Sequence, residues 1–411
     1  MTQLSPPTIL QVIPEMDTGG AELSAIEMTQ AVVRAGGRAF VATAGGRMEA
    51  RITQAGGLII ALPLASKNPI RMAANARALA AHITMHGVDL VHARSRAPAW
   101  SALWAARSRR VPFVTTYHGA YNESGRLKRA YNQVMARGDV VIANSRYTRD
   151  LIQTRYGTPA ERLQIIYRGV DVDRFDATRV EAARVDALRE AWGIAPDASV
   201  IVHAARLTGW KGQAVVIDAV AQVKRQAHEL LDNTVVVLAG DAQGREAYLA
   251  GLKAHIAREG LDDIFRLPGH CADMPAAFKL GTLAIVASTE PEAFGRAAAE
   301  AQAIGTPVIS TNIGAPPETV LAPPDVAAHA STGWLVPPSD ADALARAITQ
   351  ALRAPADERA ARAARARAHV REAFTTRAMQ HQTLAVYDEL LGSALVQRFE
   401  RADGDEARPQ A

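Results

Sequence analysis

Two glutamates, Glu292 and Glu300, stand eight positions apart, the first in a predicted loop and the second in the helix that follows. The loop comes after an apolar strand at 283–287, and the helix begins after Gly295. Free N–H groups and the dipole at a helix start favour a phosphate there. Because helical side chains lean towards the N-terminus, a phosphate at residues 295–297 would have a carboxylate on either side. Ionised carboxylates accept hydrogen bonds from hydroxyl groups, so the pattern indicates a site for a nucleotide sugar.

Two cations, Arg206 and Lys211, lie five positions apart in a glycine-containing loop between a predicted strand at 200–204 and a helix at 215–226. Arginine offers a planar fork and lysine a mobile point charge, so together they can hold a diphosphate from one side. They would also stabilise the charge that develops on a nucleotide leaving group. Taken alone, the same residues also fit a solvated loop.

Polar residues also follow predicted strands in the first half of the chain. His118 comes directly after the strand at 113–116, where a histidine is either a packed core residue or one that faces a ligand. Arg94 and Arg96 follow the strand at 88–92 and could bind acidic groups of an acceptor, or they could be surface arginines. Tyr121, in the same segment as His118, belongs to this candidate acceptor group.

A glycine pair, Gly19 and Gly20, joins the strand at 9–13 to the next predicted helix. Glycines at such a junction let the backbone approach a ligand closely, although a plain tight turn is the alternative. The dinucleotide fingerprint G-x-G-x-x-G is absent, and a lone glycine pair is weak evidence for a nucleotide.

The elements that must position these residues alternate between strand and helix along the chain, which predicts an α/β fold with doubly wound parallel sheets. Ligands of such sheets bind beyond the C-terminal ends of the strands. A second series of strands begins near residue 200. We therefore predict an N-terminal domain at 1–175 and a C-terminal domain at 176–373, followed by a helix at 374–395. The polar residues 396–411 are expected to form a disordered tail.

Composition fits this organisation and excludes several classes of protein. The 411 residues are 48% hydrophobic and 21% charged, which is typical of globular domains, and the single cysteine rules out an intrachain disulfide. No apolar run reaches the length of a membrane span, and no signal peptide is expected. Charge is uneven: residues 1–175 hold 22 Lys and Arg against 12 Asp and Glu, and residues 176–411 hold 24 against 30. A basic half can attract nucleic acid, an acidic substrate or an anionic membrane.

The stretch Glu292-x-Phe294-Gly295-x4-Glu300-Ala301-x-Ala303-x-Gly305-x-Pro307-Val308 resembles the E-x7-E motif of the retaining GT-B glycosyltransferases of family four, the glycogen-synthase-like group. Arg206 and Lys211 match the Arg-x4-Lys pair of that family, and the resemblance covers about residues 9–395. It implies two Rossmann-like domains that face a central cleft, with the helix at 374–395 packed back on the first domain. The C-terminal domain would bind the nucleotide sugar, and the N-terminal domain would bind the acceptor.

The resemblance also implies roles for individual residues. The catalytic group would be His118, which points at the donor sugar in the family, together with Arg206, Lys211 and Glu292. The donor would contact Gly19, Gly20, Arg206, Lys211, His270, Glu292, Ala293, Phe294, Gly295, Arg296 and Glu300. The family usually has Asn-Gly-Val-Asp where this chain has Arg168-Gly169-Val170-Asp171, so the side-chain contacts of that loop are open.

The expected reaction is metal-independent transfer of a hexose from a UDP- or GDP-sugar, without a further cofactor, to a glycan or lipid-linked acceptor of the cell envelope. The departing diphosphate would act as the base, and the anomeric configuration would be retained. The enzyme would be cytoplasmic and could contact the inner face of the membrane weakly. Two alternatives stay open: an epimerase or hydrolase acting on a nucleotide sugar, and a basic module that binds RNA or membrane.

Overall fold

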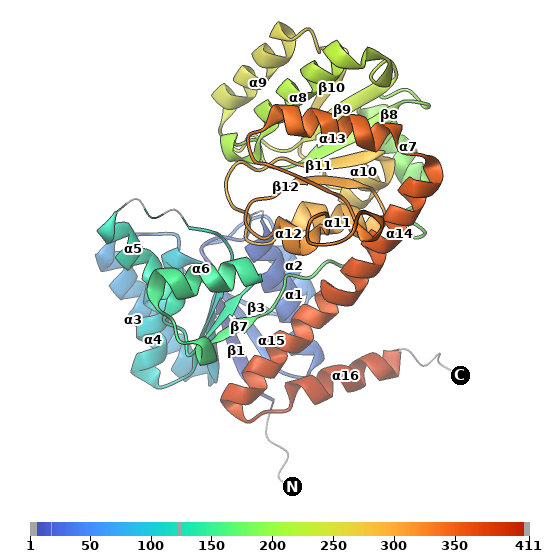
Figure 1. Cartoon of the computed structure of the whole chain (residues 1–411). Coiled ribbons are helices and arrows are strands. Elements are labelled where there is room, and N and C mark those ends of the chain that lie inside the picture. The colour runs from blue at the N-terminus through green and yellow to red at the C-terminus, as the bar shows by residue number, and fades with distance from the viewer. Residues whose placement is uncertain (1–5, 18, 122, 124, 407–411) are drawn as a thin grey trace. The chain divides into compact units, whose positions relative to one another are not determined.

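The computed structural model describes residues 6–17, 19–121, 123 and 125–406, and the chain forms two compact units (Figure 1). Unit 1 consists of Met1–Gly169 and Thr376–Ala411, and unit 2 consists of Val170–Thr375. Each unit is built around one sheet of parallel strands with helices between them, so the predicted α/β class with two parallel sheets is confirmed.

The sheet of unit 1 has seven strands in the order β3-β2-β1-β4-β5-β6-β7. Strand β1 is buried along its whole length, as expected for a parallel strand covered on both faces. Leu10 and Val12 point into a core shared with α3 and α4, whereas Ile9 points into a core shared with α1 and α15. The strands are β1 (Thr8–Val12), β2 (Arg38–Thr43), β3 (Leu58–Ala61), β4 (Leu90–Ala93), β5 (Phe113–Tyr117), β6 (Val140–Ala143) and β7 (Leu163–Ile165).

The helices of unit 1 follow from apolar positions that repeat at helical spacing and from clear end signals. Asn68 caps α3 through its side chain, and Gly87 ends that helix in the left-handed conformation. The helices are α1 (Gly20–Arg34), α2 (Glu49–Gln54), α3 (Pro69–His86), α4 (Arg96–Arg109), α5 (Arg126–Asn132), α6 (Arg146–Tyr156), α15 (Thr376–Leu391) and α16 (Leu395–Glu406), with 3-10 turns η1 (Gln133–Ala136) and η2 (Ala160–Arg162).

The C-terminal segment differs from the expectation of a disordered tail. That prediction is wrong for residues 396–406, which belong to helix α16, whereas 407–411 lie outside the described residues. The Asp388 carboxylate accepts hydrogen bonds from the backbone N–H groups of Leu395, at 2.7 Å, and Val396, at 2.9 Å, and so caps the helix. Leu395 and Phe399 lie one turn apart and are buried in the core that α1 and α15 share. This short apolar pair is too sparse to stand out among polar residues in the sequence.

The sheet of unit 2 has six strands in the order β10-β9-β8-β11-β12-β13. Its central strand β8 pairs with β9 on one side and β11 on the other. The strands are β8 (Ser199–Ala204), β9 (Thr234–Ala239), β10 (Phe265–Gly269), β11 (Leu283–Val286), β12 (Val308–Thr311) and β13 (Trp334–Val336). The helices are α7 (Ala182–Ala191), α8 (Gln213–Gln226), α9 (Glu246–Arg258), α10 (Met274–Leu280), α11 (Arg296–Ile304), α12 (Pro316–Thr319), α13 (Ala341–Arg353) and α14 (Ala356–Ala373), with 3-10 turns η3 (Gly209–Lys211), η4 (His228–Leu230) and η5 (Ala328–Ala330).

Both strand orders reverse direction at one point, which we call the switch point. It lies between β1 and β4 in unit 1 and between β8 and β11 in unit 2. In open α/β sheets the loops that leave neighbouring strands diverge at such a point, and ligands bind there, beyond the C-terminal ends of the strands. Arg94 follows β4, and Arg206 and Lys211 follow β8. Within the described part of the chain, no helix is long and apolar enough to cross a membrane.

Candidate functional site

The two loops at the switch point of unit 2 are held against each other by backbone contacts. Gly212 has a left-handed φ of 74°, and a Cβ atom at this position would lie 1.9 Å from the carbonyl oxygen of Ala287. The N–H of Thr289 donates to the carbonyl of Trp210 at 2.7 Å. Only glycine therefore fits at position 212, and the close approach brings the loop after β8 to the loop after β11.

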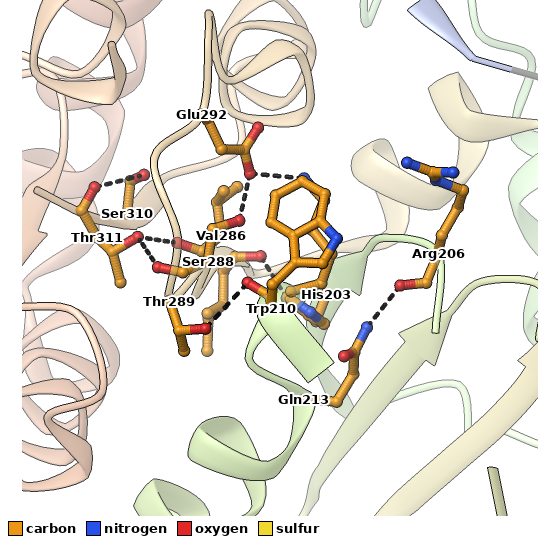
Figure 2. A network of polar contacts seen from close by, with 12 residues as sticks. His203, Arg206, Trp210, Gln213, Val286, Ser288, Thr289, Glu292, Ser310 and Thr311 are labelled. Carbon is orange, nitrogen blue, oxygen red and sulfur yellow. Dashed lines mark hydrogen bonds and ion pairs between the residues drawn. The ribbon is translucent and has the colours of Figure 1, made fainter. Parts of the chain in front are cut away.

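This approach creates an ion pair between Lys211 and Glu292. The lysine Nζ lies 2.6 Å from Oε1 of Glu292, and the two side chains are 17% and 11% exposed. The hydroxyl of Ser288 donates to the same carboxylate oxygen (Figure 2). Burial alone would raise the pKa of Glu292, but Lys211 and Ser288 outweigh it, so that the pKa is lowered. Glu292 is thus an ionised carboxylate at rest, unsuited to act as a proton donor.

The backbone around Glu292 is fixed as firmly as its side chain. Glu292 forms a parallel bridge with Gly314, and the N–H of Ala315 donates to the Glu292 carbonyl at 2.9 Å. A Cβ atom on Gly314 would lie 2.4 Å from the Glu292 carbonyl oxygen, so the glycine permits this contact. On the other side, the hydroxyl of Thr311 donates to the carbonyl of Ser288 at 2.8 Å (Figure 2).

A buried histidine, His203, lies beside the pair and was not predicted. It is 2% exposed, and its Nδ1 lies 2.9 Å from the carbonyl oxygen of Ile285, to which the ring donates (Figure 2). Burial lowers the pKa of His203 to about 4, and the nearby Lys211 contributes to this effect. Sequence reasoning also missed Ser288. Both residues could have been found as polar residues at the end of an apolar strand. His203 lies near the end of β8, and Ser288 comes just after β11.

Arg206, the second predicted cation, lies on the exposed side of the same loop. Its backbone carbonyl accepts a hydrogen bond from the Nε2 of Gln213 at 3.0 Å, which fixes the loop to the start of α8 (Figure 2). Among the residues that the structure describes, its guanidinium makes no hydrogen bond or ion pair. Arg206 is therefore available to bind an anion. Lys211 would first have to release the Glu292 carboxylate.

The start of α11 has the geometry that an anion site needs. Gly295 has a left-handed φ of 84° at the N-cap, and no side chain caps the helix. Glu300 is engaged at rest, because the Nε of Arg296 lies 2.7 Å from its carboxylate. The preceding Ala293 and Phe294 are buried and hold the loop on the unit, so they act as packing residues here.

His270 lies apart from this cluster in the part of the chain that the structure describes. It is exposed and follows β10, which lies at the edge of the sheet, two strands from β8. Its predicted contact with the base of a nucleotide remains a prediction.

In unit 1, His118 follows β5 and is paired with Arg168, which follows β7. The Nη2 of Arg168 lies 2.8 Å from Nδ1 of His118. Burial, and next Arg168, lower the pKa of His118 well below its ordinary value; Arg94 and His92 act in the same direction. The ring is therefore neutral at ordinary pH.

Gly20 lies against the Arg168–His118 contact, and Arg94 is buried in the same unit. A Cβ atom on Gly20 would lie 2.0 Å from Nη1 of Arg168, so the guanidinium lies directly against the start of α1, whereas Gly19 has a φ of 151°. Arg94 is 2% exposed and donates from Nε to the side chain of Gln11 at 2.6 Å, so it is not a surface arginine.

Arg96 and Tyr121 form a separate contact in the same unit. The Arg96 guanidinium lies 4.0 Å from the centre of the Tyr121 ring and donates to Asn132 at 2.8 Å. Tyr121 in turn packs on the ring of Tyr117, with centroids 4.4 Å apart. Over the described residues, no cluster of three or more His, Cys, Asp or Glu side chains could hold a metal ion.

Comparison with known proteins decides the family. The sequence model of Glycosyltransferase Family 4 matches residues 18–174, and that of Glycosyl transferases group 1 matches residues 185–369. The chain is 30% identical to a glycosyltransferase from Rickettsia africae ESF-5, with a TM-score of 0.85 over 96% of this chain and 100% of the other. The chain belongs to the group 1 glycosyltransferases. The family predicted from the E-x7-E stretch is thereby confirmed.

Two further proteins are similar to this chain. Anabaena HepE, solved in complex with UDP-glucose, is 26% identical, with a TM-score of 0.79 over 93% of this chain and 99% of that one. A D-inositol 3-phosphate glycosyltransferase of Jonesia denitrificans is 29% identical over 267 residues, which are 61% of this chain and 60% of the relative. The chain thus matches about three fifths of the length of that curated relative.

Proposed function

We propose that this protein is a retaining glycosyltransferase that moves a hexose from a nucleoside-diphosphate sugar to a glycan or glycolipid acceptor. The observation that carries the proposal is the Lys211–Glu292 pair at the switch point of unit 2, with the unengaged guanidinium of Arg206 on the same loop. Cations there can receive a diphosphate, and the uncapped start of α11 offers N–H groups to the same anion.

Donor binding would rearrange two contacts. Lys211 would turn from Glu292 to the diphosphate, which frees the Glu292 carboxylate to accept hydrogen bonds from hydroxyls of the transferred sugar. Glu300 would likewise leave Arg296 and accept from the ribose hydroxyls. Each carboxylate exchanges a cation for hydroxyl donors, so that neither is left without a hydrogen bond.

The reaction would then proceed on one face of the sugar. The acceptor hydroxyl attacks the anomeric carbon while the bond from that carbon to the diphosphate oxygen breaks. The diphosphate takes the hydroxyl proton as it leaves, and Arg206 and Lys211 stabilise its charge. Glu292 does not serve as the base, because its carboxylate is then occupied by the hydroxyls of the transferred sugar. Unit 1 would bind the acceptor and contribute His118.

The comparisons support a particular choice of substrates. HepE is described with UDP-glucose, which favours a UDP-hexose over a GDP-hexose as the donor. The curated relatives are named for inositol 3-phosphate, a phosphorylated acceptor, and this fits the excess of 22 cationic over 12 anionic residues in positions 1–175. We propose an anionic acceptor, such as an intermediate of lipopolysaccharide or another envelope polysaccharide.

The test is a panel of donors measured in two ways. UDP-, GDP- and ADP-glucose are first compared for the rise in melting temperature that bound ligand produces, and UDP-glucose is expected to give the largest rise. Donors that bind are then incubated with the enzyme, with and without lipid-linked and phosphorylated acceptors. Product only in the presence of acceptor supports the transferase. Conversion of the donor alone would identify an epimerase or hydrolase, and binding of RNA without binding of any nucleotide sugar would reject both.

We also propose that the protein works on the cytoplasmic side and contacts an anionic membrane weakly. Leu127 in α5 is 89% exposed and is flanked by Arg126, Lys128 and Arg129. An apolar side chain among cations suits an anionic lipid surface. Cosedimentation with vesicles that contain phosphatidylglycerol should exceed that with neutral vesicles and fall in Leu127→Ser. Equal sedimentation with both vesicle types would reject membrane contact.

A further inference from the structure

The contact between Arg168 and His118 determines which nitrogen of the imidazole carries the proton. Every nitrogen of a guanidinium is a donor, and arginine stays charged in proteins. Since Nη2 of Arg168 lies 2.8 Å from Nδ1 of His118, Nδ1 must be the acceptor. The neutral ring then carries its proton on Nε2, because a neutral imidazole has one donor and one acceptor.

The other ring nitrogen is left for a ligand. Nε2 of His118 is buried and has no hydrogen-bond partner among the residues that the structure describes. An unpaired buried N–H is costly, and such groups in native structures usually have a functional reason. An N–H fixed in direction can donate to an oxygen of a substrate, but it cannot accept a proton from one.

Arg168 is itself packed against the start of α1. Its Nη1 occupies the space where a side chain on Gly20 would begin, 2.0 Å from an ideal Cβ position. The charged and titratable groups that act on the His118 ring are Arg168 from the loop after β7, with Arg94 and His92 from the end of β4, and Tyr121 contacts the His118 backbone. The two arginines and His92 each oppose a positive charge on His118, as does burial. Nothing in this set would stabilise an imidazolium.

We infer that Arg168 is a positioning residue that locks His118 in the Nε2–H tautomer, so that His118 acts as a fixed hydrogen-bond donor to a substrate oxygen and never as a proton acceptor. This inference rests on the proposed function for the identity of the substrate, but the tautomer itself is a property of the protein alone. Arg168 stands where the resembling family usually has asparagine, which has no permanent charge.

The experiment reads the ring directly by nuclear magnetic resonance. The full-length protein is labelled with nitrogen-15 histidine, and the His118 signals are assigned by their loss in His118→Gln. In the parent protein, Nε2 should show a protonated shift and Nδ1 an unprotonated one, unchanged from pH 8 to pH 5.5. A protonated Nδ1, or titration of His118 within this range, would overturn the inference.

Three variants of Arg168 separate the effect of its hydrogen bond on the His118 tautomer from the effect of its charge on the His118 pKa. Arg168→Met keeps the stem but removes the donor, so the tautomers should mix and the pKa of His118 should rise. Arg168→Gln should keep the Nε2–H tautomer with a higher pKa, and Arg168→Lys should restore both. Arg71→Met, an exposed arginine on α3, is the control and should leave His118 unchanged. An Arg168→Met protein that folds and shows the parent tautomer and titration would overturn the inference.

Transfer rates supply the functional arm. If the pKa of His118 in Arg168→Met approaches its ordinary value near 6.5, about nine tenths of the ring is protonated at pH 5.5. A protonated ring carries a proton on Nε2 whichever tautomer the neutral ring had, so transfer by this variant relative to the parent should not fall between pH 8 and pH 5.5. A tenfold fall, with the ring shown to titrate, would mean that His118 must accept a proton and would overturn the donor role. Absence of transfer in the parent protein with every donor would instead reject the proposed function and leave the tautomer result standing.

Discussion

The two sheets of the protein have the same strand order around their switch points, yet the side chains that follow their strands differ in charge and in how firmly they are held. In unit 2 the switch point carries an ion pair, Lys211–Glu292, beside the exposed Arg206. In unit 1 the buried Arg94 follows β4 at the switch point and the neutral His118 follows the neighbouring strand β5, and both are held by side chains of the same unit. The first arrangement can exchange partners with an incoming anion, and the second is fixed in advance. The shared fold therefore supplies a location, while the residues at the strand ends decide what binds there.

Loss of the cation in unit 2 should have the largest effect on activity. Lys211→Met removes one of two charges proposed to stabilise the leaving diphosphate and leaves Glu292 without its partner. Transfer should fall about 10²–10³-fold, the usual loss for a deleted group that stabilises transition-state charge. Steady-state transfer rates are compared with those of Lys253→Met, which replaces an exposed lysine on α9. Equal rates in the two folded variants would contradict the assignment.

The neutral histidine beside the ion pair should make unit 2 sensitive to acid. The pKa of His203 is about 4 in the folded chain and near 6.5 when unfolded, so the unfolded chain binds more protons between these values. Stability should therefore fall by about 3 kcal/mol as pH drops from 6.5 to 4. Hydrogen exchange of β8 and β9 amides measures this, and His203→Gln should lose less stability over the same interval. An identical pH dependence in both proteins would show that His203 is not the cause.

The two switch-point glycines should differ in the cost of an added methyl group. In Gly212→Ala, Cβ would meet a backbone carbonyl at 1.9 Å with a φ of 74°, so a loss of about 2 kcal/mol or more and displacement of Lys211 are expected. In Gly20→Ala, the atoms nearest to Cβ would belong to the end of the Arg168 side chain, which can move. A loss below about 1 kcal/mol is expected there. Chemical denaturation compares the two variants, and the reverse order would contradict this account of the loops.

A modest loss of stability is expected from a change in the buried polar network of unit 1. Tyr387 in α15 lies 2.6 Å from Nδ1 of His92, whose Nε2 lies 2.7 Å from Thr116. Tyr387→Phe removes the hydrogen bonds of this hydroxyl with His92 and Arg94 and should cost about 1–2 kcal/mol. Tyr131→Phe is a matched control, because its hydroxyl has no hydrogen-bond partner within the described chain. If the two variants lose the same stability by chemical denaturation, the network does not stabilise the unit.

The sequence alone predicted much of unit 2, because its signals are local. The strand, the turn at Gly295 and the helix after it follow from neighbouring residues, and the E-x7-E spacing identified the family correctly. The direct contact between Lys211 and Glu292 was not predicted. It depends on the close approach at Gly212, which joins segments about eighty residues apart.

Unit 1 was harder to predict, because its contacts join residues that lie far apart. Arg168 reaches His118 across fifty positions, and Tyr387 reaches His92 across 295. Contacts between residues so far apart along the sequence produce no periodic pattern from which they could be predicted. The C-terminal helix α16 was missed for a related reason: its stability comes from Phe399 packing in a core built by α1 and α15, not from a strong apolar repeat of its own.

The most direct test of the difference between the switch points is the binding of UDP, measured by titration calorimetry. If the switch point of unit 2 holds the donor diphosphate, Lys211→Met should weaken binding about 10- to 100-fold, as expected for one charge-assisted hydrogen bond. His118→Gln in unit 1 should leave UDP binding within about twofold, since this ligand lacks the sugar that His118 is proposed to contact. The account is contradicted if Lys211→Met binds UDP as tightly as the parent protein.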